Sequence, residues 1–276
     1  MKRQRRSQSI LLHLVMIPLA LLFLLPIFWM IVASTRPEHQ ILAAPPSLLP
    51  GNEFGANWRD LNDDLDFVRA IFNSIAIAAI FTTLATLVSA MGGYAFAKFR
   101  FRGRTTLFLI VVTALTIPFE VRAIPQFLLV ARDLHLQNTW WAIILPGLAT
   151  PLGIFFMRQN MLSVPSELLE AARIDGAGEL RIFARIVLPI MQPALAAVAI
   201  VLFLFQWNDY FWPLLILTTK SAYTIPVALG TLVGLTRVSW GGIMVGTAIA
   251  TAPFLLLFLF LQRYFVAGIT AGAVKD

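Results

Sequence analysis

The feature that most constrains the fold of this chain is the gathering of its hydrophobic residues into six long blocks. The blocks fall at about residues 10–33, 70–97, 105–130, 139–157, 192–218 and 242–265. About 20 apolar residues, rising about 1.5 Å each as a helix, cross the roughly 30 Å hydrocarbon layer of a bilayer. The sequence therefore predicts an all-α integral membrane protein with six transmembrane helices.

Composition supports this class. Hydrophobic residues make up 59% of the 276 and charged residues 13%, whereas about a quarter of a soluble domain is charged. The net charge of +7 does not indicate nucleic acid, because the basic residues flank apolar blocks and do not cluster with stacking aromatics. The chain has no cysteine, which excludes disulfides and thiol chemistry.

The first block predicts a retained helix. The start MKRQRR resembles a signal peptide, but the apolar run Ile10–Ala33 is longer than the usual apolar region of about 7–15 residues. With the N-terminus in the cytoplasm, 14 of the 21 Lys and Arg residues fall in inside segments, 6 fall outside, and Arg122 lies within a block. This asymmetry predicts that both termini are cytoplasmic.

Two local patterns refine the blocks. Pro118 and Pro125 interrupt the outer half of the third block, which we expect to be kinked or to line water. Small residues recur where helix backbones would approach closely, and these positions predict helix packing or contact with a second membrane subunit. They are Ser89, Gly92 and Gly93 in the second block, and Gly242, Gly246, Ala250 and Ala252 in the sixth.

The loop at 158–190 has helical signals of its own. Ser163 and Pro165 mark a helix start. Gly176 suits a left-handed helix stop, and Pro189 closes a second short helix. The apolar faces expected for the two helices are Leu168, Ala171 and Ala172, followed by Leu180, Phe183 and Val187.

The same loop resembles a known family. Glu170-Ala171-Ala172, Gly176, Ile186 and Leu188-Pro189 match every fixed position of EAA-x3-G-x9-I-x-LP, the motif of bacterial ABC importer permeases. The chain is most similar to carbohydrate permeases of the maltose and glycerol-3-phosphate type, over about residues 65–276. An ordinary amphipathic loop on the membrane surface is the alternative for this segment.

The resemblance implies a type I ABC importer permease in the bacterial cytoplasmic (inner) membrane. It implies a transmembrane pore subunit that takes up a sugar or related solute by alternating access. The implied docking residues for an ATPase are Glu170, Ala171, Ala172, Asp175, Gly176, Ile186, Leu188 and Pro189. The implied divisions are an N-terminal helix with an outer loop at 1–69, a permease core at 70–266 and a tail at 267–276.

The partners implied are a cytoplasmic ABC ATPase dimer, a second homologous permease in a heterodimer and an extracytoplasmic solute-binding protein. The chain contains no G-x-x-x-x-G-K-[ST] sequence, so we expect no catalytic site and no cofactor on it. ATP and magnesium would bind the partner ATPase. His13, His39 and His135 are scattered, which argues against a metal site.

Polar residues inside apolar blocks are candidates for the solute path, because they are costly in a membrane. The candidates are Trp207, Asn208, Asp209, Tyr210 and Glu120. Interfacial placement of the aromatic residues, capping by Asp209 and a local Glu120–Arg122 pair are the structural alternatives. We expect Asn73 and Ser74 to form a helix end that meets water.

Two other function classes remain open on the residues alone. An ion-coupled secondary transporter would place carboxylates near the midplane of the bilayer, where this chain offers only Glu120 and Asp209. An intramembrane serine hydrolase would need a motif such as G-x-S-x-G, which the sequence does not contain.

Overall fold

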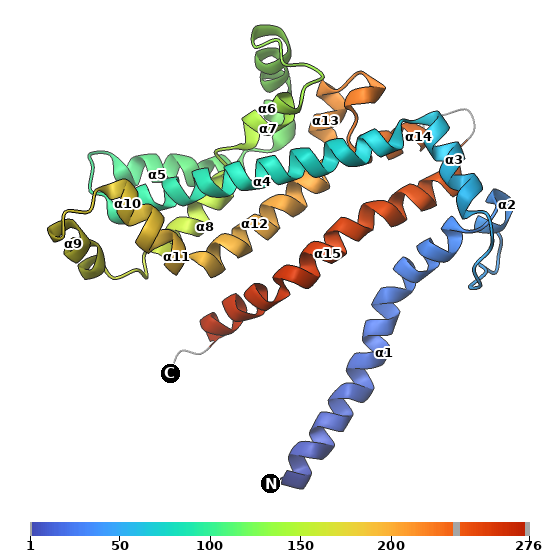
Figure 1. Cartoon of the computed structure of the whole chain (residues 1–276), viewed down its shortest axis with the longest axis horizontal. Helices are drawn as coiled ribbons and strands as arrows, with labels where there is room; N and C mark the ends of the chain where they lie inside the picture. The colour runs from blue at the N-terminus through green and yellow to red at the C-terminus, as the bar shows by residue number, and fades with distance from the viewer. Residues whose placement is uncertain (1, 234–237, 274–276) are drawn as a thin grey trace. The chain divides into compact units, whose positions relative to one another are not determined.

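The computed structural model describes residues 2–233 and 238–273, and every regular element in these residues is a helix (Figure 1). Side chains at 2–11, 64, 257–258 and 260–273 lie outside the description. The all-α class is thereby confirmed. The helices are α1 (Lys2–Ser34), α2 (Glu38–Ile41), α3 (Phe54–Asp64), α4 (Phe67–Lys98), α5 (Arg104–Thr113), α6 (Phe119–Phe127), α7 (Trp140–Ile144), α8 (Pro151–Met161), α9 (Ser166–Ile174), α10 (Glu179–Ile182), α11 (Leu188–Ile190), α12 (Gln192–Trp207), α13 (Phe211–Ile216), α14 (Ile225–Val233) and α15 (Trp240–Ala273).

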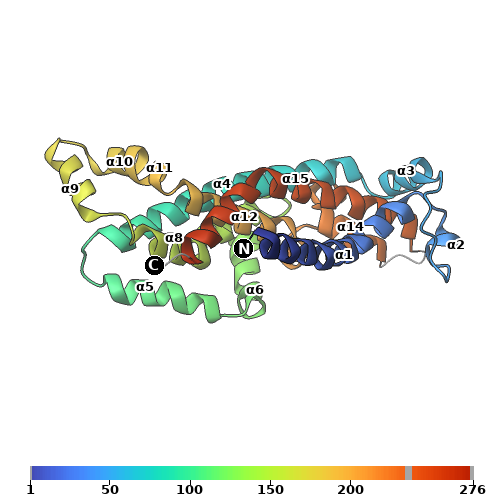
Figure 2. The same ribbon diagram turned by 90° about the horizontal axis from the view of Figure 1, so that it is seen from below.

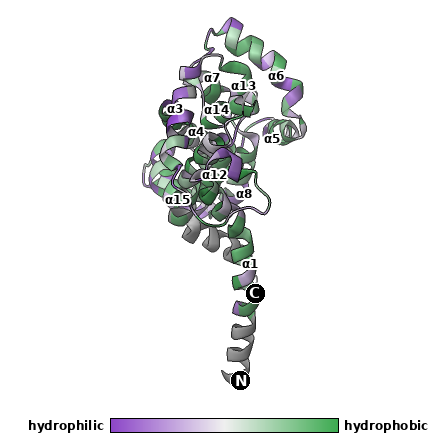
Figure 3. Ribbon diagram, turned by 90° about the vertical axis from the view of Figure 1, so that its right-hand side faces the viewer, coloured by the Kyte–Doolittle hydropathy of each residue, from purple (hydrophilic) through white to green (hydrophobic). Residues whose placement is uncertain are grey.

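The chain forms two compact units, which we describe separately. The first comprises Met1–Val68 and Ala228–Pro253, and the second comprises Arg69–Val227 and Phe254–Asp276. In the first unit Asn57 Nδ2 donates hydrogen bonds of 2.9 Å to the carbonyl oxygens of Ser34 and Arg36. The apolar side chains of α1 are largely exposed from Leu12 to Ile31. In Figure 3 the coloured part of α1 is mainly hydrophobic, and α3 is mainly hydrophilic.

The small residues of α4 pack against α8 in the second unit. A Cβ atom on Gly93 would lie 2.6 Å from Met157 Cβ and 2.8 Å from the Arg158 nitrogen, so only glycine fits there. Gly92 faces the Ile154 side chain and Ser89 faces Gly153. The predicted packing role of this stripe is confirmed, since the close approach requires residues without bulk.

The glycines of the sixth block also allow close packing, within the first unit. A Cβ on Gly246 would lie 3.1 Å from the Phe67 ring, and one on Gly242 would lie 3.4 Å from Leu61 Cβ. Phe67 and Leu61 are fully buried. These glycines therefore serve packing within this chain.

Several predicted spans are broken helices. Among the described residues, Leu12–Ser34 and Phe67–Lys98 are unbroken and long enough to cross a membrane. Three further pairs of helices are bent, by 100° at 104–133, by 45° at 140–161 and by 81° at 179–207. The first two bends lie inside the third and fourth predicted blocks, and the 81° bend lies just before the fifth block begins at 192. The 100° bend falls beside Pro118, so the predicted interruption of the third block is confirmed.

The fifth and sixth blocks differ from their expected limits. The helix of the fifth block ends at Trp207, and a short separate helix, α13, follows the break. At the C-terminus, α15 continues to Ala273 and enters the segment 267–276 expected to be a tail. Residues 274–276 of that segment lie outside the described residues.

Candidate functional site

The segment 158–190 folds as two short helices joined by a glycine turn, as the sequence predicts. Figure 2 shows α9, α10 and α11 together at one end of the long helix α4. Pro165 is the N-cap of α9, and Glu167 lies in the first turn, where the helix dipole favours a negative charge. The helix α10 continues through a π-helical turn into α11, which includes Pro189, and the chain bends by 81° before α12.

Gly176 makes the turn between the two helices. Its φ of +80° lies in the left-handed region, which glycine adopts without the penalty that a Cβ atom imposes. The Gly176 N–H donates to the Arg173 carbonyl at 3.0 Å, and the Ala177 N–H donates to the Ala172 carbonyl at 2.9 Å. These two bonds form a Schellman motif, which satisfies the last carbonyl groups of α9 and fixes the direction in which the chain leaves it.

Buried apolar residues anchor this segment to the core of the second unit. Leu169, Ile182 and Val187 are almost fully buried. The Phe183 ring lies 5.4 Å from the Tyr94 ring of α4, measured between centroids. The loop is therefore packed against the end of α4 and is not a loose connection.

A chain of polar contacts links the same elements. Arg173 Nε donates to Glu179 Oε1 at 2.6 Å, across the glycine turn, and the Tyr94 hydroxyl donates to Glu179 Oε2 at 3.0 Å. The hydrogen bond from Arg173 lowers the pKa of the Glu179 carboxyl, and the same bond raises the pKa of the Arg173 guanidinium. The glycine turn is therefore closed by a charge-assisted bond and tied to α4.

Sequence patterns did not identify Tyr94, Arg173 or Glu179 as partners. Arg173 and Glu179 are six residues apart across a glycine turn, so helical periodicity does not pair them. Tyr94 is 85 residues from Glu179. The available signal was a pair of opposite charges flanking a predicted turn.

Two cationic side chains, Lys98 of α4 and Arg158 of α8, form contacts at the start of the loop. Lys98 Nζ donates to the Val164 carbonyl. Arg158 Nε donates to the Phe96 carbonyl at 3.3 Å, and the Arg158 guanidinium lies 4.0 Å from the centroid of the Phe108 ring. These contacts fix the start of the segment, where it leaves α8.

The outward surface of α9 has small and apolar side chains. Glu170 and Ala171 are exposed, and Leu168 and Ile174 are 41% and 85% exposed. Ala172 is only half-buried. The expected face at 168, 171 and 172 therefore points mainly away from this chain, while Leu169 points into the core.

One residue of the apolar face predicted for the second helix is not buried. Phe183 and Val187 are buried as predicted, but Leu180 is 77% exposed. Ile182 is buried in its place, because the π-helical turn at Phe183–Val187 shifts the spacing of the inward face. Leu180 thereby adds to the exposed apolar surface of the loop.

The remaining motif residues lie at the ends of these helices. Asp175 is the C-cap of α9 and is exposed, as is Gly176. Ile186 and Leu188 are half-buried, and Pro189 is exposed within α11. The motif residues therefore follow the whole segment, and the exposed ones cluster about the end of α9.

The fifth-block candidates for the solute path have local structural roles. Trp207 is 6% exposed and stacks on Phe203 at 5.6 Å between ring centroids. Asn208 Nδ2 donates to the Leu204 carbonyl at 2.8 Å. Asp209 is half-buried and directly precedes Tyr210, the N-cap of α13.

Tyr210 and Glu120 are more accessible than the other candidates. Tyr210 is 42% exposed, and Glu120 is exposed in the first turn of α6. The described residues show no Glu120–Arg122 ion pair, and Arg122 lies instead over the Phe119 ring, 5.3 Å from its centroid. Residues two apart on a helix do not face each other.

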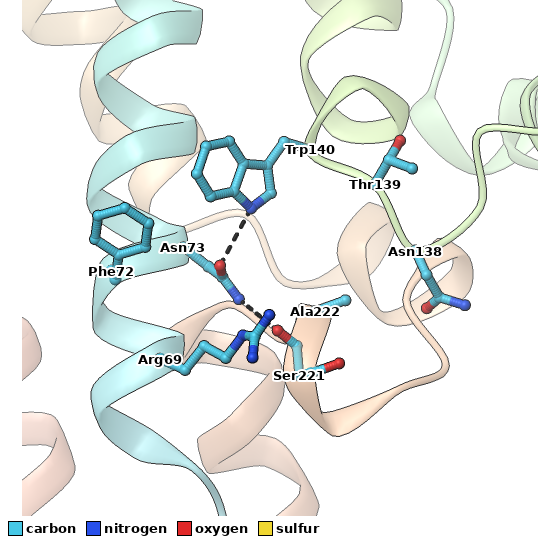
Figure 4. Close-up of a pocket in the computed structure, with 8 residues that line it drawn as sticks. All are labelled: Arg69, Phe72, Asn73, Asn138, Thr139, Trp140, Ser221 and Ala222. Atoms are coloured by element: carbon cyan, nitrogen blue, oxygen red, sulfur yellow. Dashed lines mark hydrogen bonds between the residues drawn. The ribbon is translucent and has the colours of Figure 1, made fainter.

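Asn73 and Ser74 correct another expectation, since both are almost fully buried and do not meet water. Asn73 Nδ2 donates to the carbonyls of Ser221 and Tyr223 at 3.0 Å, and Trp140 Nε1 donates to Asn73 Oδ1 at 3.1 Å. Figure 4 shows Asn73 between Trp140 and Ser221.

The pocket in Figure 4 has a volume of about 420 Å³. Its lining includes the Arg69 side chain and the Phe72 and Trp140 rings. The Asn138 amide on its rim is engaged with Thr218, because Nδ2 donates to the Thr218 hydroxyl at 2.9 Å. The amides of Asn73 and Asn138 therefore hold three segments of the chain together around this pocket.

Known proteins resemble this chain over most of its length. The model of a family described as "Binding-protein-dependent transport system inner membrane component" matches residues 85–271. The arabinooligosaccharides transport system permease protein AraQ of Halalkalibacterium halodurans is 38% identical over 260 residues, which are 93% of this chain and 93% of that protein.

A second relative and a solved structure extend the comparison. The sn-glycerol-3-phosphate transport system permease protein UgpE of Pectobacterium atrosepticum is 33% identical, covering 98% of each chain. A crystal structure of a bacterial ABC transporter involved in the import of the acidic polysaccharide alginate has a similar chain, with a TM-score of 0.75 and 25% identity. That match covers 95% of this chain and 98% of the other.

Proposed function

Because the chain belongs to the family of binding-protein-dependent transport system inner membrane components, we propose that it is the pore subunit of an importer for carbohydrates or related solutes. In this proposal the segment 158–190 docks on a separate cytoplasmic ATPase. The ATPase binds and hydrolyses ATP with magnesium, and this chain converts the movement into alternating access.

The observation that supports this proposal most directly is the surface of α9. Ala171 is small and exposed, and Ile174 is 85% exposed beside it. A short helix with a shallow apolar face fits a groove on a partner protein. The buried Leu169 and the Glu179–Tyr94 bond hold the other side of this segment, so a force applied to α9 reaches α4.

The topology proposed is six membrane spans with both termini in the cytoplasm. The unbroken spans Leu12–Ser34 and Phe67–Lys98, the bent pairs at 104–133 and 140–161, the helix α12 and the apolar start of α15 supply six candidates. Placing segment 158–190 inside also places most of the basic residues inside. The exposed apolar surface of α1 would face lipid or a neighbouring subunit.

The full assembly proposed contains four kinds of component. They are this chain, a second and similar permease in a heterodimer, an ATPase dimer and an extracytoplasmic solute-binding protein. The description of the family names the binding protein, and the alginate transporter is an ABC importer. The assembly would lie in the bacterial cytoplasmic membrane, where this chain is multi-pass.

The proposed cargo is a sugar or a derivative of one. The relatives are named for arabinooligosaccharides and for sn-glycerol-3-phosphate, and the alginate transporter is named for an acidic polysaccharide. These molecules share hydroxyl groups, which amide and carboxylate side chains bind. Tyr210 and Glu120 are the accessible candidates for the solute path, whereas Trp207 would need to move to reach a solute.

Single cysteine residues test the docking and the topology together, because the chain has no cysteine of its own. Ala171→Cys should crosslink to the ATPase in the complex purified with its native partners. In intact spheroplasts a membrane-impermeant maleimide should not label it. Thr219→Cys, which is also exposed, should show the reverse pattern, with labelling from outside and no crosslink.

Proteoliposomes that contain the complex test the source of energy. Uptake of a radiolabelled cargo, identified from the binding protein, should require ATP on the side of α9 and persist when ion gradients are collapsed. Uptake that stops with the ion gradient and continues without ATP would favour an ion-coupled secondary transporter. Absence of any Ala171→Cys crosslink in actively transporting complexes would reject the docking role.

A further inference from the structure

A second polar site lies in the connection between α4 and α5. A pocket of about 430 Å³ is lined by Arg100, Phe101, Gly103, Arg104, Thr105 and Thr106. All of these residues belong to the second unit and come from one short stretch. The docking segment at 158–190 contributes no residue to the pocket.

The positive charge of this stretch is not balanced by acidic residues nearby in the sequence. Arg100, Arg102 and Arg104 alternate along it, and the sequence has no Asp or Glu between Asp66 and Glu120. The salt bridges among the described residues involve other arginines, and Arg100 and Arg102 are exposed. A concentrated positive charge of this kind attracts anions, and the planar guanidinium fork suits phosphate.

The shape of the pocket is set by anchored residues. Arg104 Nη1 donates to the Phe99 carbonyl at 3.1 Å, and the Phe101 ring lies 6.0 Å from the Phe96 ring, between centroids. Gly103 turns the chain with a φ of +82°. Thr105 and Thr106 line the same pocket, and a threonine hydroxyl is able to donate a hydrogen bond to an oxyanion.

The surface beside the pocket is apolar. On α5, Leu107, Leu109 and Ile110 are 48%, 57% and 60% exposed. A polar pocket that continues into an exposed apolar helix matches the two parts of a lipid, a charged headgroup and its acyl chains. A free phosphate ion would use the arginines and leave this apolar surface without a role.

We propose that the arginines at 100–104 bind the phosphate of an anionic lipid headgroup, with an acyl chain against α5. Basic pockets at the cytoplasmic ends of membrane helices bind anionic headgroups through the same combination of charge and hydrogen bonds. The proposed topology assigns the lipid to the cytoplasmic leaflet. The binding itself is measurable without that assignment and without transport.

The test is native mass spectrometry of the full chain in detergent, titrated with dioleoylphosphatidylglycerol. Arg100→Gln/Arg102→Gln should weaken binding on the order of tenfold, because each basic residue near a lipid phosphate contributes to affinity. Arg181→Gln/Arg185→Gln is the matched control, since it removes two exposed arginines from the docking segment. The control should bind the lipid as the original chain does.

Two further titrations separate the sources of the phosphate. Zwitterionic phosphatidylcholine should bind much more weakly, and 10 mM inorganic phosphate should displace little of the phosphatidylglycerol. Binding of inorganic phosphate that depends on Arg100 and Arg102, without lipid binding, would overturn the lipid assignment. Equal lipid affinity in the original chain and in Arg100→Gln/Arg102→Gln, or equal weakening in both double variants, would overturn the site.

Discussion

Replacing Gly176 by alanine isolates the backbone contribution to the docking segment. The φ of +80° costs a residue with a Cβ atom roughly 1–2 kcal/mol. A Cβ at this position would meet nothing within 4 Å, so no steric clash adds to that cost. The lower flexibility of alanine in the unfolded chain offsets about 0.4–1 kcal/mol.

The expected net loss is about 1 kcal/mol in the stability of the turn, which corresponds to roughly a fivefold shift in population. Amide exchange in residues 172–179 should therefore accelerate by about that factor. Affinity for the ATPase should fall by a similar factor, if docking requires the closed turn.

Gly178 provides the matched control. It is exposed, a Cβ there would also meet nothing within 4 Å, and its φ is −70°. Gly178→Ala should therefore neither accelerate exchange nor weaken affinity. Gly176→Asn should lose less than Gly176→Ala, since asparagine tolerates the left-handed region.

Proline at this position should disrupt the turn more than alanine does. Gly176→Pro imposes a φ near −65° and removes the N–H that donates to the Arg173 carbonyl. Transport should be abolished while membrane insertion persists. Equal behaviour of Gly176→Ala and Gly178→Ala in both assays would refute the role assigned to the backbone turn.

Other predictions concern side-chain contacts within the second unit. The pKa of the Glu179 carboxyl is lowered in the folded state, so its pair with Arg173 should stabilise the fold fully at a pH above the ordinary carboxyl pKa. This stabilisation should be lost as the pH falls through the lowered pKa. The difference in thermal midpoint between the original chain and Glu179→Gln should therefore shrink below about pH 4. Gly93→Ala should lower the free energy of unfolding by about 1–3 kcal/mol, because its Cβ would meet the backbone of α8, and Gly92→Ala should cost less, because its neighbour is a side chain. Asn73→Ala should destabilise by about 1–3 kcal/mol by leaving two carbonyls and an indole N–H without their partner, and an unchanged melting curve in detergent would contradict this reading.

Much of the fold follows from the sequence because its causes are local. Membrane helices need only length and apolar composition, and the described residues contain helices at all six predicted blocks. The turn at 176 was also predictable, because a glycine after a short amphipathic segment is a frequent helix stop. The break near Pro118 has the same local origin.

The contacts of polar side chains were much less predictable. Asn73 was expected to meet water, yet it is buried by segments 67 and 148 residues away along the chain. Periodicity identifies residues that share a face, but it does not identify what covers that face.

The sequence by itself determined that this chain is a bundle of apolar helices with a helix–glycine–helix segment, since hydrophobic length and turn chemistry act over a few residues. Only the tertiary structure decided that Glu179 joins Arg173 to Tyr94, and that Leu180 points outward while Ile182 is buried. Those outcomes depend on which distant surfaces meet, and that depends on the packing of the whole unit.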